Sequence, residues 1–354
     1  MNSNNQQLIE LMTDMQTQDA LYKPTTFWKE ASKVIIEDFT KKDMQDFRNF
    51  SSSLGMFVPT YAFPEYIHNN KKYVSIQENL KETTEDVKSN LKLEMLIRGE
   101  VQAFADYRVL CASDKNFSPY LNKVSESTVG NPPEQFIFDG RNFSRSFLNY
   151  LLGLSFLKQH VDTSKIKTIL EIGGGFGTLG EILLQEERNQ CFYINVDIPP
   201  VLSASTYYLQ ELFGNSNIAD YTRLKKFKTI DIEQLQTQYK AACISSWQLP
   251  KLEGKIDLFV NFISFQEMEP EVVQNYCEHI TRLNPEYILL RNIEEGKRKQ
   301  DKDYIYGVKE PIVGDRYDTF LPQYRLIATD ESIFGLKMED NFHSQLRLYV
   351  KKAA

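Results

Sequence analysis

The sequence predicts an α/β fold in which a mostly parallel sheet is covered by helices on both faces. From residue 167 onward, short apolar runs typical of buried strands alternate with segments of helical periodicity. This alternation indicates parallel strands joined by helical crossovers. Two strand-like runs at 324–330 and 344–352 close the chain with no helical pattern between them. We therefore expect a Rossmann-like sheet with an antiparallel C-terminal strand.

The individual elements follow from local composition and from breaker residues. From residue 167 to residue 293, five segments have the apolar, β-rich composition of strands: 167–172, 191–197, 241–247, 255–263 and 286–293. Four segments have helical spacing: 144–161, 178–187, 199–214 and 270–283. The segment 199–214 opens on two prolines and closes on a glycine, which is the usual asymmetry of a helix.

The first 143 residues differ from the rest of the chain. Helical spacing occurs at 27–39 and at 90–110, but no strand-helix alternation is seen there. The stretch 127–144 is rich in turn-forming residues and has the composition of a joint. We expect a mainly helical N-terminal cap or substrate domain at 1–143 and a Rossmann-like domain at 144–354.

Composition restricts the classes of partner. The net charge of −7 argues against a nucleic-acid binder, which usually has a basic surface. No apolar run approaches the roughly 20 residues that span a bilayer, so no membrane insertion is expected. Four cysteines without a CxxC pair indicate reduced thiols and a cytoplasmic protein. No group of His, Asp and Glu has metal-ligand spacing, so no metal is expected.

A glycine-rich loop follows the first strand of the predicted sheet. The segment TILEIGGGFGTLG (168–180) carries glycines that let a ligand approach the bare backbone. No lysine follows, which excludes a P-loop. Two patterns overlap: the dinucleotide fingerprint GxGxxG at Gly175, Gly177 and Gly180, and ExGxGxG, which begins at Glu171. The loop therefore suits either a dinucleotide or S-adenosylmethionine.

Two acidic residues and the late strands help to choose between these ligands. Glu171 would repel a pyrophosphate, whereas its carboxylate suits the ammonium group of S-adenosylmethionine. Asp197 ends the second strand, where an acid binds ribose hydroxyls in NAD and S-adenosylmethionine sites alike. A closing hairpin fits a methyltransferase sheet better than a dehydrogenase. An NAD(P)-dependent oxidoreductase and a non-catalytic binding protein of the same fold are the alternatives.

Four core segments resemble motifs of the class I S-adenosylmethionine-dependent methyltransferases. They are LEIGGGFGTLGEIL (170–183), NVDIPPVL (195–202), KIDLFVNFISFQEM (255–268) and YILLRNI (287–293). DIPPVL is similar to the Asp-Leu-Pro-x-Val segment of small-molecule O-methyltransferases, in which the aspartate holds the ribose.

Segments outside the core resemble the bacterial sugar O-methyltransferase family. They are YKPTTFWKEA (22–31), GNPPEQFIFDGRNFSRSFLNY (130–150), FQEMEPEVVQNY (265–276) and YGVKEPIVGDRYDTFLPQY (306–324). The resemblance covers most of the chain. It implies a cytoplasmic enzyme that transfers a methyl group from S-adenosylmethionine to a sugar hydroxyl of a small-molecule or glycan acceptor, as in surface-polysaccharide synthesis. The oligomeric state is left open, with a homo-oligomer as one option.

The implied cofactor site combines the loop with the ends of the following strands. In this fold the segment after the third strand walls the adenine, which assigns Ser246 and Trp247 to the base. The expected cofactor-binding residues are Glu171, Gly173, Gly174, Gly175, Gly177, Asp197, Ile198, Ser246, Trp247, Asn261 and Phe262.

The acceptor is expected beside the loop after the fourth strand. Plant-type O-methyltransferases carry a His-Asp pair there, whereas this chain has Gln266 and Glu267. Glutamine cannot take a proton, so Glu267 is the first candidate for the general base and His343 the second; a cap of the following helix is the alternative role for Glu267. Acceptor contacts are expected from Gln266, Arg291, Tyr306 and Tyr317.

Overall fold

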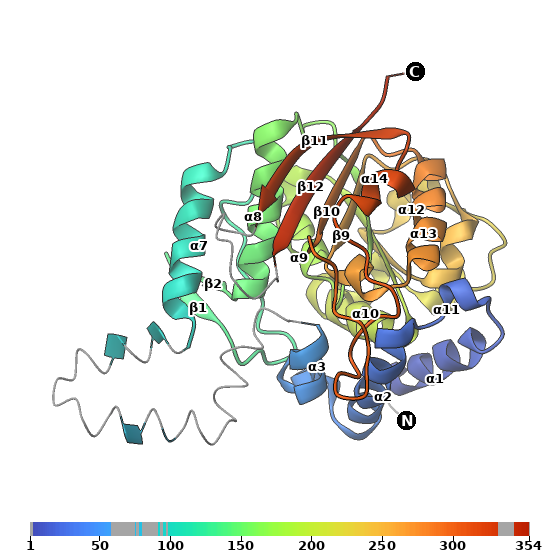
Figure 1. Ribbon diagram of the computed structural model, residues 1–354, viewed down its shortest axis with the longest axis horizontal. Helices are drawn as coiled ribbons and strands as arrows, with labels where there is room; N and C mark the ends of the chain where they lie inside the picture. The colour runs from blue at the N-terminus through green and yellow to red at the C-terminus, as the bar shows by residue number, and fades with distance from the viewer. Residues whose placement is uncertain are drawn as a thin grey trace.

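The computed structural model describes residues 3–57, 75, 78–79, 91–92, 95–96, 98–331 and 343–353. Its centre is an eight-stranded sheet with the order β11-β12-β10-β9-β3-β4-β7-β5 (Figure 1). The strands are β3 (Thr168–Ile172), β4 (Phe192–Asp197), β5 (Ile218–Ala219), β7 (Ala241–Ser245), β9 (Leu258–Phe262), β10 (Tyr287–Ile293), β11 (Tyr324–Glu331) and β12 (Ser344–Lys351).

Strand direction confirms the predicted fold class. Neighbouring strands from β10 through β5 are parallel. β12 is antiparallel to both β10 and β11, so it alone runs against the sheet and lies between its two neighbours. The sheet is therefore Rossmann-like, mostly parallel with an antiparallel C-terminal strand. Glu171 of β3 pairs with Asn195 of β4 and Val260 of β9, which places its side chain at the centre of the sheet.

Helices cover both faces of the sheet, as alternating strands and helices require. One apolar core includes side chains of α8 (Arg145–His160), α9 (Thr178–Gln185) and α10 (Pro199–Phe213). A second core lies on the opposite face and includes side chains of α12 (Ile232–Gln238), α13 (Pro270–Leu283) and α14 (Arg316–Phe320). Every strand thus buries side chains on both sides.

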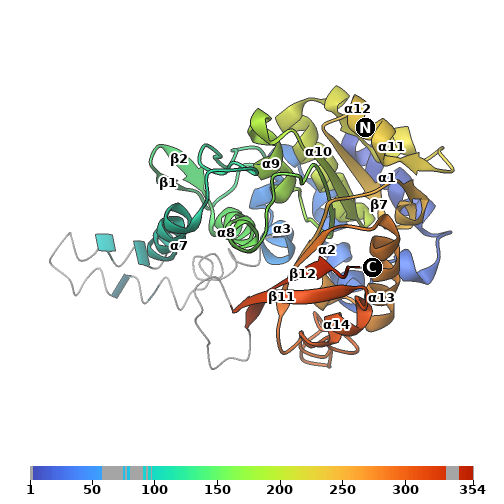
Figure 2. The ribbon, with the colours of Figure 1, turned by 90° about the horizontal axis from the view of Figure 1, so that it is seen from above.

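The N-terminal part packs directly on the sheet domain. Its helices are α1 (Ser3–Met15), α2 (Thr26–Lys41), α3 (Ser51–Met56) and α7 (Glu100–Ser113). Figure 1 shows α1, α2 and α3 along the lower side of the molecule, and Figure 2 shows α8 between α7 and the sheet. Phe47 is fully buried, with its ring 5.8 Å from that of Phe176, which lies within the glycine-rich loop. One continuous core joins the two parts, and the domain boundary at 143 stays a prediction.

Short elements complete the chain. β1 (Phe136–Phe138) and β2 (Arg141–Phe143) form an antiparallel pair in the stretch predicted as a joint. β6 (Ile230–Asp231) and β8 (Leu252–Glu253) form a parallel pair, and α11 (Tyr221–Leu224) precedes them along the chain. Of the 3-10 helices, η5 (Ser246–Lys251) follows β7 directly, and η6 (Ser264–Glu267) follows β9 after Ile263.

Most predicted elements are confirmed, and the differences are local. The expected strand at 241–247 ends at Ser245, because Ser246 already belongs to η5. The expected helix at 90–110 lies partly outside the described residues; α7 begins only at Glu100, after Gly99 with φ +78°. Within the described residues, no helix is long and apolar enough to cross a bilayer.

Candidate functional site

The glycine-rich loop has a backbone that requires glycine at several positions. Gly173, Gly175 and Gly177 have φ values of +70°, +59° and +101°, in the left-handed region that side chains disfavour. A Cβ at Gly173 would lie 2.1 Å from Ser264 Oγ, so packing excludes it as well. At Gly175 the nearest atom to such a Cβ is 4.0 Å away, and this residue lines the cavity described below. The loop thus presents bare backbone to the cavity.

Glu171 supports this loop from behind. Its carboxylate is fully buried and accepts hydrogen bonds from Tyr150 Oη at 3.1 Å and Tyr193 Oη at 2.5 Å. A Cβ at Gly174 would lie 2.5 Å from Glu171 Oε2, so the loop can rest on the carboxylate only because that residue is glycine. Burial raises the pKa of Glu171 to about 7. Glu171 does not line the cavity itself but sets the charge directly beneath the loop.

Asp197 lies at the carboxyl end of β4 and lines the cavity. Its Oδ1 accepts a hydrogen bond from the backbone N–H of Ile198 at 2.8 Å. Its Oδ2 is buried and has no hydrogen-bond partner in the described part of the chain. Burial raises the pKa of this carboxyl well above its ordinary value, while the N–H groups of Ile198 and Gly175 lower it. A buried acceptor without a donor is costly, and a ligand hydroxyl would satisfy it.

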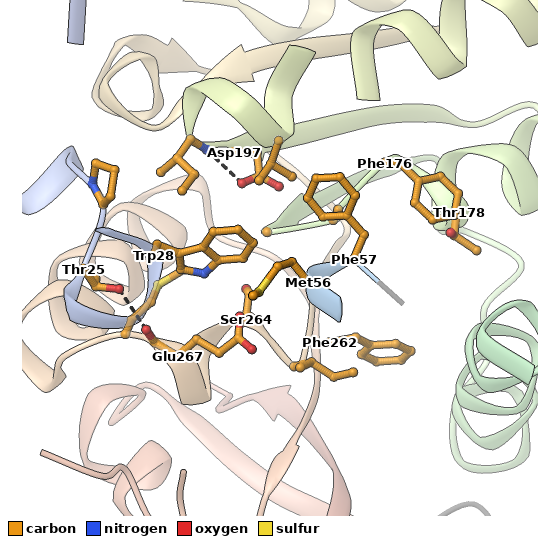
Figure 3. Close-up of a pocket in the computed structure, with 18 of the residues that line it drawn as sticks. Thr25, Trp28, Met56, Phe57, Phe176, Thr178, Asp197, Phe262, Ser264 and Glu267 are labelled. Atoms are coloured by element: carbon orange, nitrogen blue, oxygen red, sulfur yellow. Dashed lines mark hydrogen bonds between the residues drawn. The ribbon is translucent and has the colours of Figure 1, made fainter. Parts of the chain in front are cut away.

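The cavity lies between the glycine-rich loop, the loop after β9 and the N-terminal segment. In Figure 3, Trp28 of α2 lies in the middle of the lining, with Asp197 on one side and Glu267 on the other. The free volume is about 60 Å³, whereas pockets for small ligands usually measure about 300–1,000 Å³. The cavity is therefore smaller than a site for a nucleoside-sized ligand. The N-terminal contributors are Lys23, Pro24, Thr25, Trp28, Met56 and Phe57.

The loop after β9 brings Glu267 to the cavity. Ile263 begins this loop with φ +76°, a strained conformation for a β-branched residue, and strain of this kind is concentrated at functional sites. Glu267 is buried, and its Oε1 lies 3.3 Å from Lys297 Nζ. Burial raises the pKa of Glu267 above its ordinary value of 4.5, and Lys297 offsets part of that rise. Thr25 Oγ1 also donates to the backbone carbonyl of Glu267 at 2.8 Å.

Arg291 and Phe262 form a further wall of the cavity. The Arg291 guanidinium lies 5.0 Å from the centre of the Phe262 ring, and the Tyr150 ring lies 5.0 Å from the same ring. Burial lowers the pKa of Arg291 to about 10, so the group remains charged at neutral pH. This wall combines aromatic surface with a cation.

Two predicted site residues instead hold the loop after β9 in place. Asn261 donates to the Ile172 carbonyl at 2.8 Å, and its Oδ1 accepts from the Phe265 N–H at 3.2 Å. Gln266 Oε1 accepts from the Ile293 N–H at 2.7 Å. Neither residue lines the cavity.

Four other predicted contacts lie outside the lining. Ser246 Oγ donates to the Tyr22 carbonyl at 2.6 Å, and Trp247 packs edge-on against Tyr221. Tyr306 packs against Phe27, and Tyr317 is buried in the core around α13 and α14. The cavity lining instead includes Trp28, Tyr150 and Tyr276, which the sequence analysis does not assign. Trp28 lies in the segment 22–31 that carries the family resemblance, and this was its only signal.

His343 lies outside the cavity lining and beside acidic residues. His343 Nδ1 pairs with Glu295 Oε1, and one ligand atom each from Glu294, Glu295 and His343 lie within 4.8 Å of one another. No local sequence pattern predicts this group, because the pairing of β12 with β10 brings His343 to the end of β10 from far along the chain. The spacing of these ligand atoms suits a metal ion, although His343 and Glu295 already form a pair without one.

No model of a known protein family matches the sequence, and no curated protein matches it. Among solved structures, the chain is similar to magnesium protoporphyrin IX methyltransferase of Synechocystis PCC 6803 with S-adenosylmethionine bound, at 12% identity and TM-score 0.36, over 59% of this chain and 86% of that one. It is similar to mitomycin 7-O-methyltransferase at 11% identity and TM-score 0.36, over 57% and 53% of the two chains. It is also similar to the PH0226 protein of Pyrococcus horikoshii OT3 at 13% identity and TM-score 0.39, over 59% and 92%.

The raised pKa of Glu171 predicts a pH-dependent effect on stability. Since the folded pKa of about 7 exceeds the ordinary 4.5, the native state binds the proton more tightly, and the free energy of unfolding falls as pH rises from 4.5 to 7. Glu171→Gln removes this group. The difference in melting temperature, variant minus wild type, should therefore rise between pH 5 and pH 8. The corresponding change in the free energy of unfolding is up to about 3 kcal/mol. Melting curves at four pH values test this, and a constant difference would contradict it.

Proposed function

We propose that this chain is an S-adenosylmethionine-dependent O-methyltransferase that acts on a sugar hydroxyl. The observation that carries the proposal is the unpartnered Oδ2 of Asp197, buried beside the bare loop at Gly173–Gly175. An acid at the end of the second core strand, next to such a loop, suits the ribose hydroxyls of a nucleoside. Oδ2 would accept a hydrogen bond from a ribose hydroxyl, whereas Oδ1 already accepts from the Ile198 N–H.

The charge beneath the loop favours S-adenosylmethionine over a dinucleotide. The Glu171 carboxylate lies directly behind Gly174, where it would attract an ammonium group and repel a pyrophosphate. Tyr150 donates to Glu171 and also lines the cavity, so it joins the carboxylate to the ligand side of the loop. When bound, the cofactor supplies an electrophilic methyl group on a sulfonium. The oxidoreductase alternative has no comparable support.

Glu267 is the proposed general base. A sugar hydroxyl is a poor nucleophile at neutral pH, and a positioned base typically contributes about 10²–10⁴ in rate. Burial raises the pKa of the Glu267 carboxyl above its ordinary value, which makes the carboxylate a stronger base, and Lys297 offsets part of that rise. The position of Glu267 in the cavity wall opposite Asp197 suits an acceptor bound beyond the methyl group (Figure 3).

The proposal of a sugar acceptor is based on the segments outside the core, which resemble the bacterial sugar O-methyltransferase family. Trp28 and Thr25 belong to one of these segments and line the cavity, as do Met268, Val272 and Tyr276 from another. Residues from segments that carry the resemblance therefore line the same cavity as the glycine-rich loop, although the segment 306–324 contributes none. The N-terminal part would close over the acceptor and exclude water from the reacting groups.

Asp197→Asn tests the cofactor assignment. Isothermal titration with S-adenosylhomocysteine should give binding to the wild type and at least about tenfold weaker binding to the variant, because hydrogen bonds to a charged acceptor contribute about 1.5–3 kcal/mol. Asp220→Asn is the matched control, since Asp220 caps α11 away from the cavity. Equal affinities in all three proteins, or binding of NADH in place of S-adenosylhomocysteine, would contradict the assignment.

Glu267→Gln tests the base. After nucleotide sugars and glycans have been screened for an acceptor, the turnover of the variant should fall by about 10²–10⁴ while its affinity for S-adenosylhomocysteine is retained. The control is Glu269→Gln, a buried neighbour outside the cavity lining that accepts from the Thr26 N–H. Wild-type turnover in Glu267→Gln would exclude Glu267 as the base.

A further inference from the structure

Arg291 differs from every other buried arginine in the described part of the chain. Arg48 pairs with Glu126, Arg145 with Glu134 at 2.5 Å, and Arg347 with Asp318 at 3.1 Å. Arg291 is only 4% exposed, yet it forms no ion pair or hydrogen bond through its side chain with any described residue. Its Nε is buried without a partner. A charge buried in this way is costly unless something pairs with it.

The surroundings of Arg291 do not neutralise it. Asp106 of α7 is an acidic neighbour, but it is 1% exposed and forms no hydrogen bond within the described residues. Burial raises the pKa of Asp106 to about 8, so this carboxyl is mostly uncharged at neutral pH. Glu171 is the other acidic neighbour, and its two oxygens already accept from Tyr150 and Tyr193.

The guanidinium is held in position by aromatic packing. It lies over the Phe262 ring at 5.0 Å, and both residues line the cavity. Stacking on a ring fixes the plane of a guanidinium while leaving its N–H donors available. Arg291 therefore stands in the cavity wall with a guanidinium that no described residue pairs with through a hydrogen bond or ion pair. A guanidinium fork of this kind matches the two oxygens of a carboxylate or phosphate.

We propose that Arg291 is the receptor for a carboxylate or phosphate group of a ligand bound in this cavity. The inference rests on the proposed function for the use of the cavity and adds to it the chemistry of one ligand group. Two sources supply that group: the α-carboxylate of the cofactor's amino-acid end, or an acidic group on the acceptor, such as a uronic acid or a sugar phosphate. Each source gives a different outcome on substitution.

The test uses Arg291→Met, which removes the charge, and Arg291→Lys, which keeps the charge but loses the fork. Arg347→Lys is the matched control, a buried and paired arginine of β12 outside the cavity lining. The probes are S-adenosylhomocysteine, 5′-methylthioadenosine, which lacks the amino-acid end, inorganic phosphate and glucuronate. Binding is measured by calorimetry, and melting curves check folding; if Arg291→Met does not fold, Arg291→Lys provides the comparison.

Either of two results supports the inference. If the cofactor carboxylate binds Arg291, Arg291→Met weakens the binding of S-adenosylhomocysteine at least about tenfold but that of 5′-methylthioadenosine less than twofold. The affinity of Arg291→Lys for S-adenosylhomocysteine lies between those of the wild type and Arg291→Met. If the acceptor supplies the group, both nucleosides keep their affinity, and glucuronate or phosphate binds the wild-type complex with S-adenosylhomocysteine but not the Arg291→Met complex. Arg347→Lys behaves as wild type in both cases.

Unchanged binding of every probe in both Arg291 variants would overturn the inference. This result is distinct from failure of the proposed function, in which neither nucleoside binds the wild type. In that case glucuronate and phosphate titrated into the protein alone still test Arg291, and anion binding that is equal in wild type and Arg291→Met overturns its role.

Discussion

The structure of the site depends on one buried carboxylate. Glu171 lies at the centre of the sheet and is held by Tyr150 from α8 and Tyr193 from β4. The loop that follows β3 can turn across this carboxylate only because Gly174 has no side chain. The same contact therefore joins the sheet, helix α8 and the loop. It also places an ionisable group, with a pKa raised to about 7, under the surface that faces the cavity.

The N-terminal part of the chain also forms part of the cavity wall. Phe47 packs on Phe176 within the loop, and Trp28 stands between Asp197 and Glu267 (Figure 3). The two parts of the chain share one apolar core. The free volume of the cavity is about 60 Å³, and Trp28, Met56 and Phe57 of the N-terminal part are among the residues that line it. On the proposed function, ligand entry is then coupled to displacement of the N-terminal segment, and closure would shield the reaction from water.

Sequence patterns predict the sheet well because buried parallel strands are short apolar runs with glycine and proline at their ends. The loop and Asp197 are predictable for the same reason, since they follow directly from strand ends. Contacts set by packing between distant segments are not predictable in this way. Trp28 reaches the cavity from the N-terminal part of the chain, whereas Trp247 lies in η5, outside the lining. Arg291 has no hydrogen-bond or ion-pair partner among the described residues because of where Asp106 and Glu171 lie in space. No local sequence pattern predicts these positions.

On the proposed function, S-adenosylmethionine binds in the cavity at the carboxyl ends of β3 and β4. A crystal structure of the protein with S-adenosylhomocysteine would test this directly. We expect the ribose hydroxyls within hydrogen-bond distance of Asp197 Oδ2, the amino-acid end beside Gly174 and Tyr150, and Trp28 displaced. S-adenosylhomocysteine bound elsewhere, or in this cavity with Asp197 Oδ2 still without a partner, would contradict it.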